Sequence, residues 1–274
     1  MSMMTMTRVG VSLLILGTFT YADPMEDQDM DGVPDSIDKC LNSPFLTEVD
    51  SNGCATQELI FPQERDNGSL DIIFGYGYSN DDDNINRNEQ HTAKLQLSYI
   101  LNDWIYTLRS GYITDDPDNG LTDTTFKIKK RFKPVKNFKF ALGAGVRFPT
   151  YDFRGNKADY TLYSSAIYYP VSGVSLFAGA NYTFINDEEI NSPLQNITAL
   201  YVGTGYFFTK ELYLNASYSY SDTKFANYHK IKTVSSTLFY QFSDQWFVSF
   251  SYSHELDDDD LHNSFNVRLG YSLW

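Results

Sequence analysis

The chain has 274 residues, with 35 acidic and 21 basic side chains and a formal net charge of −14 at pH 7. This charge argues against a nucleic-acid binder, because phosphate backbones are held by basic surfaces. No run of about 18 apolar residues follows position 25, which excludes a transmembrane helix there. The 21 Tyr and 20 Phe residues favour strands over helices.

The amino-terminal segment is typical of a secretory signal peptide. Arg8 gives it a positive start, Val9 to Thr20 form an apolar stretch of 12 residues, and Ala22 is a small residue at the expected cleavage position. An uncleaved anchor is the alternative, but 12 apolar residues cannot cross about 30 Å of hydrocarbon. We therefore expect residues 1–22 to be removed and the mature chain to be exported.

Cys40 and Cys54 are the two cysteines of the chain. An exported protein meets an oxidising compartment, which favours their pairing. A catalytic thiol would need a histidine partner, and all four histidines lie beyond residue 90. We expect a small loop closed by a disulfide.

An aspartate-rich segment precedes the first cysteine. It reads DQDMDGVPDSIDKC from Asp27 and spaces its carboxylates around a turn at Gly32. Because Ca²⁺ takes about six to eight oxygen ligands, such a loop can wrap one ion while a backbone carbonyl completes the shell. A solvated acidic linker is the alternative, although linkers seldom space five aspartates so regularly. The candidate ligands are Asp27, Asp29, Asp31, the Val33 carbonyl, Asp35 and Asp38.

The stretch from about residue 27 to residue 54 closely resembles a bacterial thrombospondin type 3 repeat. It shares the aspartate-rich loop, an Asn-Ser-Pro turn and a closing Val-Asp-x-x-Gly-Cys pattern, although Leu41 replaces the Pro that usually follows the first cysteine. The resemblance implies calcium at the five aspartates and a bridge between Cys40 and Cys54. We assign residues 23–56 to a calcium-binding module and residues 57–68 to a linker.

From residue 69 to residue 274, nearly every stretch alternates apolar and polar side chains with period two. This pattern predicts strands with one apolar and one polar face. Each stretch is about ten residues long, which suits a tilted strand that crosses a bilayer. Twelve strands are predicted, near residues 69–78, 91–100, 103–113, 122–132, 137–148, 159–169, 173–185, 196–208, 211–220, 231–242, 245–253 and 264–274.

The links between these strands predict their arrangement. Five short links alternate with six long polar ones, such as SNDDDNINRNEQ from Ser79 and HELDDDDLHN from His254. This layout is typical of outer-membrane barrels, whose short turns lie in the periplasm. We therefore predict an all-β fold, a transmembrane antiparallel up-and-down β-barrel of about 12 strands, over residues 69–274. A soluble β-sandwich is the alternative, but it would have to hide an apolar face along the whole chain.

The phase of the alternation assigns a face to each residue. A Lys or Arg side chain on the lipid face costs about 2–4 kcal/mol at the bilayer midplane, so basic residues within the strands are expected inside. Leu95 and Leu142 should then face lipid, and Gln96 should face the lumen. We call the inward basic residues the basic wall: Lys94, Arg109, Lys127, Lys129, Arg131, Lys139, Arg147 and Arg268.

A lumen with such a wall predicts a preference for anions, and guanidinium groups suit carboxylate or phosphate. The alternative is that the bases pair with inward acids such as Asp71 and Asp123 and fill a narrow lumen. The layout resembles the twelve-stranded outer-membrane proteins as a class, which include acidic-oligosaccharide porins, nucleoside channels, autotransporter translocators and a phospholipase. Because layout alone carries the resemblance, it does not choose among these functions.

We predict a narrow, anion-preferring diffusion channel in the outer membrane, joined to a periplasmic calcium-binding module. The expected partners are membrane lipids, lipopolysaccharide, small anionic solutes, Ca²⁺, and peptidoglycan or a periplasmic protein. An enzyme is not expected, because the one tight His–Ser pair, His262 and Ser264, has no clear third member. The competing class is a structural barrel with a plugged lumen, whose loops contact other cells or lipopolysaccharide.

Overall fold

The computed structural model describes Lys39 and residues 68–83, 86–114, 119–152, 154–188, 192–227, 229–256 and 261–273. The chain divides into two compact units, Met1–Gln57 and Glu58–Trp274, and all described strands belong to the second. The predicted signal peptide, the calcium ligands from Asp27 to Asp38, and Cys40 and Cys54 lie outside the described residues. No helix in the described part of the chain is long and apolar enough to cross a membrane.

The second unit is one antiparallel sheet with period-two alternation along its strands. Its strands are β1 (Leu70–Asp83), β2 (Asn86–Leu101), β3 (Trp104–Thr114), β4 (Gly120–Leu121), β5 (Thr124–Val135), β6 (Phe138–Phe148), β7 (Asp159–Tyr168), β8 (Val174–Phe184), β9 (Ile197–Phe207), β10 (Leu212–Ser221), β11 (Ile231–Gln241), β12 (Trp246–Glu255) and β13 (Leu261–Leu273).

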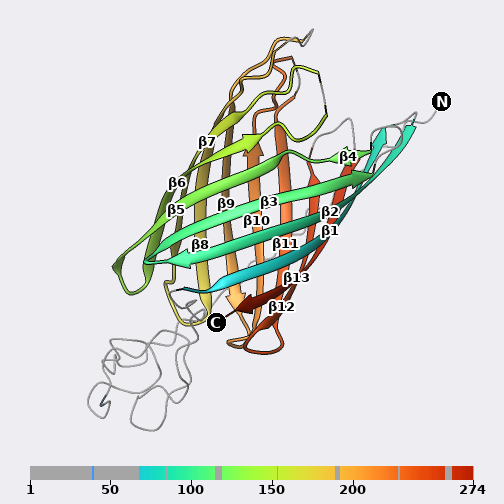
Figure 1. Cartoon of the computed structure of the whole chain (residues 1–274). Coiled ribbons are helices and arrows are strands. Elements are labelled where there is room, and N and C mark those ends of the chain that lie inside the picture. Colours follow the sequence, from blue (N-terminus) through green and yellow to red (C-terminus); the bar gives the residue numbers. More distant parts are fainter. Residues whose placement is uncertain are drawn as a thin grey trace, which may run out of the picture. The chain divides into compact units, whose positions relative to one another are not determined.

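The sheet closes on itself. β1 pairs with β2 on one side and with β13 on the other, so the first and last strands lie side by side (Figure 1). The other long strands pair with their neighbours in sequence, and the two-residue β4 pairs with β3 ahead of β5. The twelve long strands therefore form a closed antiparallel barrel, which confirms the predicted fold and strand number.

Apolar side chains cover the outer face of the barrel. Phe74 is 62% exposed, Leu142 is 52% exposed and Leu95 is 41% exposed, whereas the hydrophobic residues that are buried in the described part of the chain are few. A soluble sandwich would bury such side chains, because a continuous exposed apolar surface is unfavourable in water. The distribution suits a surface in contact with lipid.

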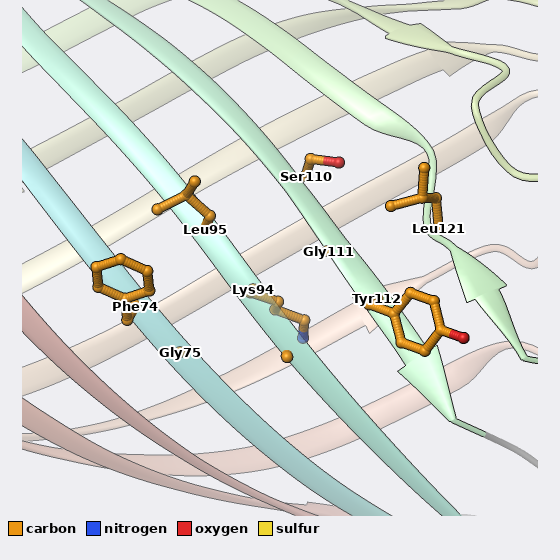
Figure 2. A pocket seen from close by; sticks show the side chains of 9 residues that line it. Phe74, Gly75, Lys94, Leu95, Ser110, Gly111, Tyr112 and Leu121 are labelled. Atoms are coloured by element: carbon orange, nitrogen blue, oxygen red, sulfur yellow. The ribbon is translucent and has the colours of Figure 1, made fainter.

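One region of the outer face is hollowed. Figure 2 shows Phe74, Leu95, Tyr112 and Leu121 around a pocket of about 360 Å³ over β1 to β4. The small residues Ala93 and Ser110 alternate in phase with Leu95 and Tyr112 and leave the space between these side chains open. The apolar lining agrees with the assignment of this face to the membrane side.

The first predicted long link is mostly strand. β1 continues to Asp83 and β2 begins at Asn86, so residues 84 and 85 alone separate them. The prediction of a loop from Ser79 to Gln90 is therefore wrong. Polar residues on both faces did not mark the end of pairing here, since a strand that continues beyond the apolar band can be solvated on both sides.

The ladder between β3 and the next segment contains a bulge. Tyr112 lies opposite Leu121, whereas Arg109 lies opposite Thr125, so one residue is extra between β4 and β5. A bulge re-aims a side chain near the end of a strand. Here the extra residue falls next to Asp123, which bonds residues at the end of the barrel that carries the long loops.

Candidate functional site

The inner face brings the basic wall together from several strands. Gly75 on β1 lies opposite Arg268 on β13 and opposite Lys94 on β2. A Cβ atom at Gly75 would lie 3.5 Å from Arg268 Cγ and 3.6 Å from Lys94 Cβ. Lys94 and Arg268 therefore flank the same glycine on the inner face, as the alternation predicts.

Arg109 on β3 lies near Lys94 and Arg268 in the electrostatics of the inner face. Its positive charge acts on Lys94, Lys127 and Arg268, so basic groups from four strands are electrostatic neighbours. Arg109 and Arg268 are both exposed, although their strand positions direct them inward. Among the described residues, open space therefore remains beside these two side chains.

The ends of the basic wall are neutralised. Near the short-turn end, Arg131 lies 3.5 Å from Asp103 in the β2–β3 turn. Near the loop end, Arg147 pairs with Asp159 and lies 3.7 Å from Asp123. The alternative of inward acids that neutralise the wall thus applies at its two ends.

The structure also describes the surroundings of Lys139, a member of the basic wall, and of Asp71, an acid expected inside. Lys139, near the short-turn end of β6, has its ammonium group 5.6 Å from the centre of the Tyr169 ring. Asp71, the other acid expected to neutralise the wall, accepts a hydrogen bond of 2.7 Å from Ser272. Asp123, which was also expected to face inward, lies beside Arg147 of the wall.

Basic residues in the middle of the wall lack the carboxylate partners that Arg131 and Arg147 have at its ends. Among the described residues, none of the five basic groups at mid-strand positions pairs with a carboxylate. The charges that act on them come from other basic residues of the wall. We call this set the central basic cluster: Lys94, Arg109, Lys127, Lys129 and Arg268.

From β8 to β12, inward positions in the middle of the strands carry uncharged groups. Hydroxyl groups pair across β11 and β12, with 2.9 Å between Thr237 Oγ1 and Ser251 Oγ. Aromatic rings lie over inward glycines of an adjacent strand, as Tyr201 does over Gly179. A ring that covers a glycine lies against the barrel wall, which limits how far it projects into the lumen.

At the end of the barrel that carries the long loops, two aspartates bind neighbouring loops through their carboxylates. Asp123 accepts hydrogen bonds from the Tyr151 backbone N–H at 3.0 Å and from Asn156 Nδ2 at 2.9 Å. Both partners belong to the β6–β7 loop. The Asp123 carboxylate therefore holds this loop on the barrel.

Asp187 continues the same pattern in the β8–β9 loop. Its carboxylate accepts the Lys157 backbone N–H at 2.8 Å and pairs with Lys224 of the β10–β11 loop. Burial alone would raise the pKa of Asp187, but these two partners hold that pKa below its ordinary value. Three loops are thus held together by one buried charge.

Two acids that pair with the basic wall, Asp103 and Asp159, were not identified from the sequence. Asp159 alternates in phase with Thr161 and Tyr163, so its inward direction could have been found by extending the strand pattern to its first residue. Asp103 lies in a turn and carries no periodic signal. Its partner depends on how β3 and β5 are aligned.

The structure also places the His–Ser pair considered in the sequence. His262 and Ser264 share one face of β13, and no hydrogen bond joins them. Within the described ranges, no group of three or more His, Cys, Asp or Glu residues could hold a metal ion. The predicted calcium ligands lie outside those ranges.

Residues 66–261 match the family model described as "Putative MetA-pathway of phenol degradation". The chain belongs to this family. No curated protein matches this member of the family.

The barrel of this chain is similar to the NanC porin, with a TM-score of 0.57 and 12% identity over 74% of this chain and 100% of that one. It is also similar to the KdgM porin, with a TM-score of 0.53 and 15% identity over the same shares. At such identities these likenesses show a shared porin fold.

Proposed function

We propose that the protein is an outer-membrane diffusion channel that prefers anions. The central basic cluster carries this proposal, because its charges point into a closed barrel and have no carboxylate partner among the described residues. A lumen with low-dielectric walls focuses the field of such charges and raises the local concentration of anions. The porin fold supports the location and the class of function.

The competing proposal is a structural barrel with a plugged lumen. The exposure of Arg109 and Arg268 favours the channel, because the described residues leave open space beside both side chains. A plugged barrel would instead be expected to bury mid-strand residues of the inner face. The pairing of Arg131 and Arg147 at the two ends fits either proposal.

The solutes proposed are small organic anions. A structure of the KdgM porin is described as a complex with oligogalacturonate, an acidic oligosaccharide. The family is described by a pathway of phenol degradation, which points to aromatic compounds. A cluster of lysine and arginine side chains can bind the carboxylate of an acidic sugar or of an aromatic acid alike.

Reversal potentials in a salt gradient across a planar bilayer test the channel. The native protein should conduct and prefer anions. Changing Arg109, Lys127 and Arg268 together to Gln should shift the preference toward cations while the barrel still folds. Arg131→Gln is the matched control, since Asp103 already offsets that charge, and it should have a smaller effect. A native protein without conductance would favour the plugged barrel.

For residues 23–56 we propose a calcium-binding module closed by a bridge between Cys40 and Cys54. The spacing of the five aspartates from Asp27 to Asp38 supports it, together with the Val33 carbonyl and the resemblance to a thrombospondin type 3 repeat. The module would stiffen a periplasmic spacer that contacts peptidoglycan or a partner protein. Residues 1–22 would direct export.

A further inference from the structure

Two lysines of the central basic cluster contact the same aromatic ring. The ammonium groups of Lys127 and Lys129 lie 4.6 Å and 5.3 Å from the centre of the Tyr163 ring. The lysines belong to β5 and the tyrosine to β7, and β6 lies between these two strands. The contact therefore spans a whole strand of the barrel wall.

Glycines on β6 make this contact possible. Gly145 lies opposite Lys127, and Gly143 lies opposite both Lys129 and Tyr163. A Cβ atom at Gly145 would come within 3.0 Å of the Tyr163 ring and 3.2 Å of Lys127 Cγ. Because no side chain separates them, the lysines and the ring meet over bare backbone.

The chemistry of this contact differs from that at the ends of the basic wall. Arg131 and Arg147 are held by carboxylates, which fix the guanidinium groups and also cancel their charge. An aromatic ring attracts an ammonium group through its quadrupole and carries no net charge. A lysine that contacts Tyr163 therefore has a partner that does not cancel its charge.

The contact lies within the central basic cluster. The charge of Arg109 acts on Lys127 and on Tyr163. A lysine has a long flexible stem, so without a partner its ammonium group would move away from neighbouring positive charges. The ring opposes that movement and keeps the cationic groups close together.

We propose that Tyr163 is a positioning residue that sets the anion preference of the lumen by holding Lys127 and Lys129 without neutralising them. This inference rests on the proposed channel function. It assigns to an uncharged residue a role that would otherwise be given to the lysines alone. It also gives Gly143 and Gly145 a defined part, which is to keep the space between β5 and β7 free.

The test measures the ratio of chloride to potassium permeability in bilayers, with heat-modifiable gel mobility as the check on folding. Tyr163→Leu removes the ring and should lower the ratio by about twofold or more, the factor expected for a solvated cation–π contact. Tyr163→Phe keeps the ring and should leave the ratio close to that of the native protein. Tyr201→Leu is the control, since that ring covers Gly179 and contacts Phe177.

A double-mutant cycle separates positioning from a general effect on the lumen. In a protein with Lys127→Gln and Lys129→Gln, Tyr163→Leu should change the ratio no further. An equal change in both backgrounds, or no change in the native background, would overturn the role of Tyr163. A native protein that conducts without preferring anions would instead overturn the proposed function. If Tyr163→Leu does not assemble, Tyr163→Gln replaces it with the same expected result.

Discussion

Arg147 and Asp159 lie opposite each other in the β6–β7 ladder, and the arginine guanidinium group bonds the aspartate carboxylate. Asp159 is 0% exposed, and its other oxygen accepts the Asn186 backbone N–H at 2.8 Å. One buried carboxylate therefore joins the inner face of the barrel to the β8–β9 loop. We expect this charge to stabilise the arrangement of the loop end.

Replacing Asp159 with Asn should destabilise the folded barrel by about 1–3 kcal/mol, less than for a fully buried pair because Arg147 is partly solvated. The change removes the ion pair and keeps an oxygen for Asn186. Urea unfolding in detergent measures the effect. Glu188→Gln is the control, since its pair with Lys157 is exposed on both sides and should contribute about 0.5 kcal/mol or less. Equal stability of the two variants would contradict this account of the loop end.

Acid should loosen the loops around Asp187. The folded pKa of this carboxyl lies below its ordinary value, so its contribution to stability is complete above the unfolded pKa of about 3.9 and is lost as the pH falls below it. Unfolding measured between pH 6 and pH 3 should show a steeper loss for the native protein than for Asp187→Asn. Parallel profiles for the two proteins would remove Asp187 as the cause.

A charge on the outer face should prevent assembly, whereas a charge on the inner face should be tolerated. Leu142→Arg places a cation on the lipid side at a cost of about 2–4 kcal/mol near the bilayer midplane. Gln96→Arg places the same group inside, among water and existing cations. The fraction of protein with heat-modifiable gel mobility after insertion into membranes should fall sharply for the first variant and little for the second. The opposite order would mean that the faces are assigned wrongly.

Calcium should bind to the oxidised full-length protein in detergent. Titration calorimetry is expected to show one or two sites with affinity of about 10⁻⁴ to 10⁻³ M, as in other extracellular modules. Asp29→Ala combined with Asp31→Ala should weaken binding strongly. The same titration on Asp103→Ala, an acid of the barrel, is the control. Absence of calcium-dependent heat at millimolar ion would refute the module.

The strands and their faces could be predicted because alternation is a local property of the sequence. Leu95 and Gln96 are neighbours, and their opposite polarity is enough to distinguish outside from inside. The same phase predicts that the basic wall lies on the inner face. Strand ends were less predictable, since the polar residues after Ser79 continue the pairing of β1 with β2.

Contacts inside the lumen could not be predicted in the same way. The contact between Lys127 and Tyr163 arises from the registers of β5 with β6 and of β6 with β7, and no sequence spacing encodes it. The pair formed by Arg131 and Asp103 likewise depends on how a turn sits beside a distant strand. Sequence could therefore identify the cationic residues, but the structure was needed to distinguish neutralised charges from those that remain.

The seam between β1 and β13 has a consequence for assembly. It places Leu70 opposite Leu273 and Asp82 opposite Leu261, and a hydrogen bond across it joins residues 201 positions apart. Pairings between such distant residues form slowly. Until β13 has been synthesised and inserted, the free edge of β1 offers unpaired backbone groups to any other chain. We therefore expect closure of the seam to come late in folding, and the nascent protein to need protection from aggregation until that step is complete.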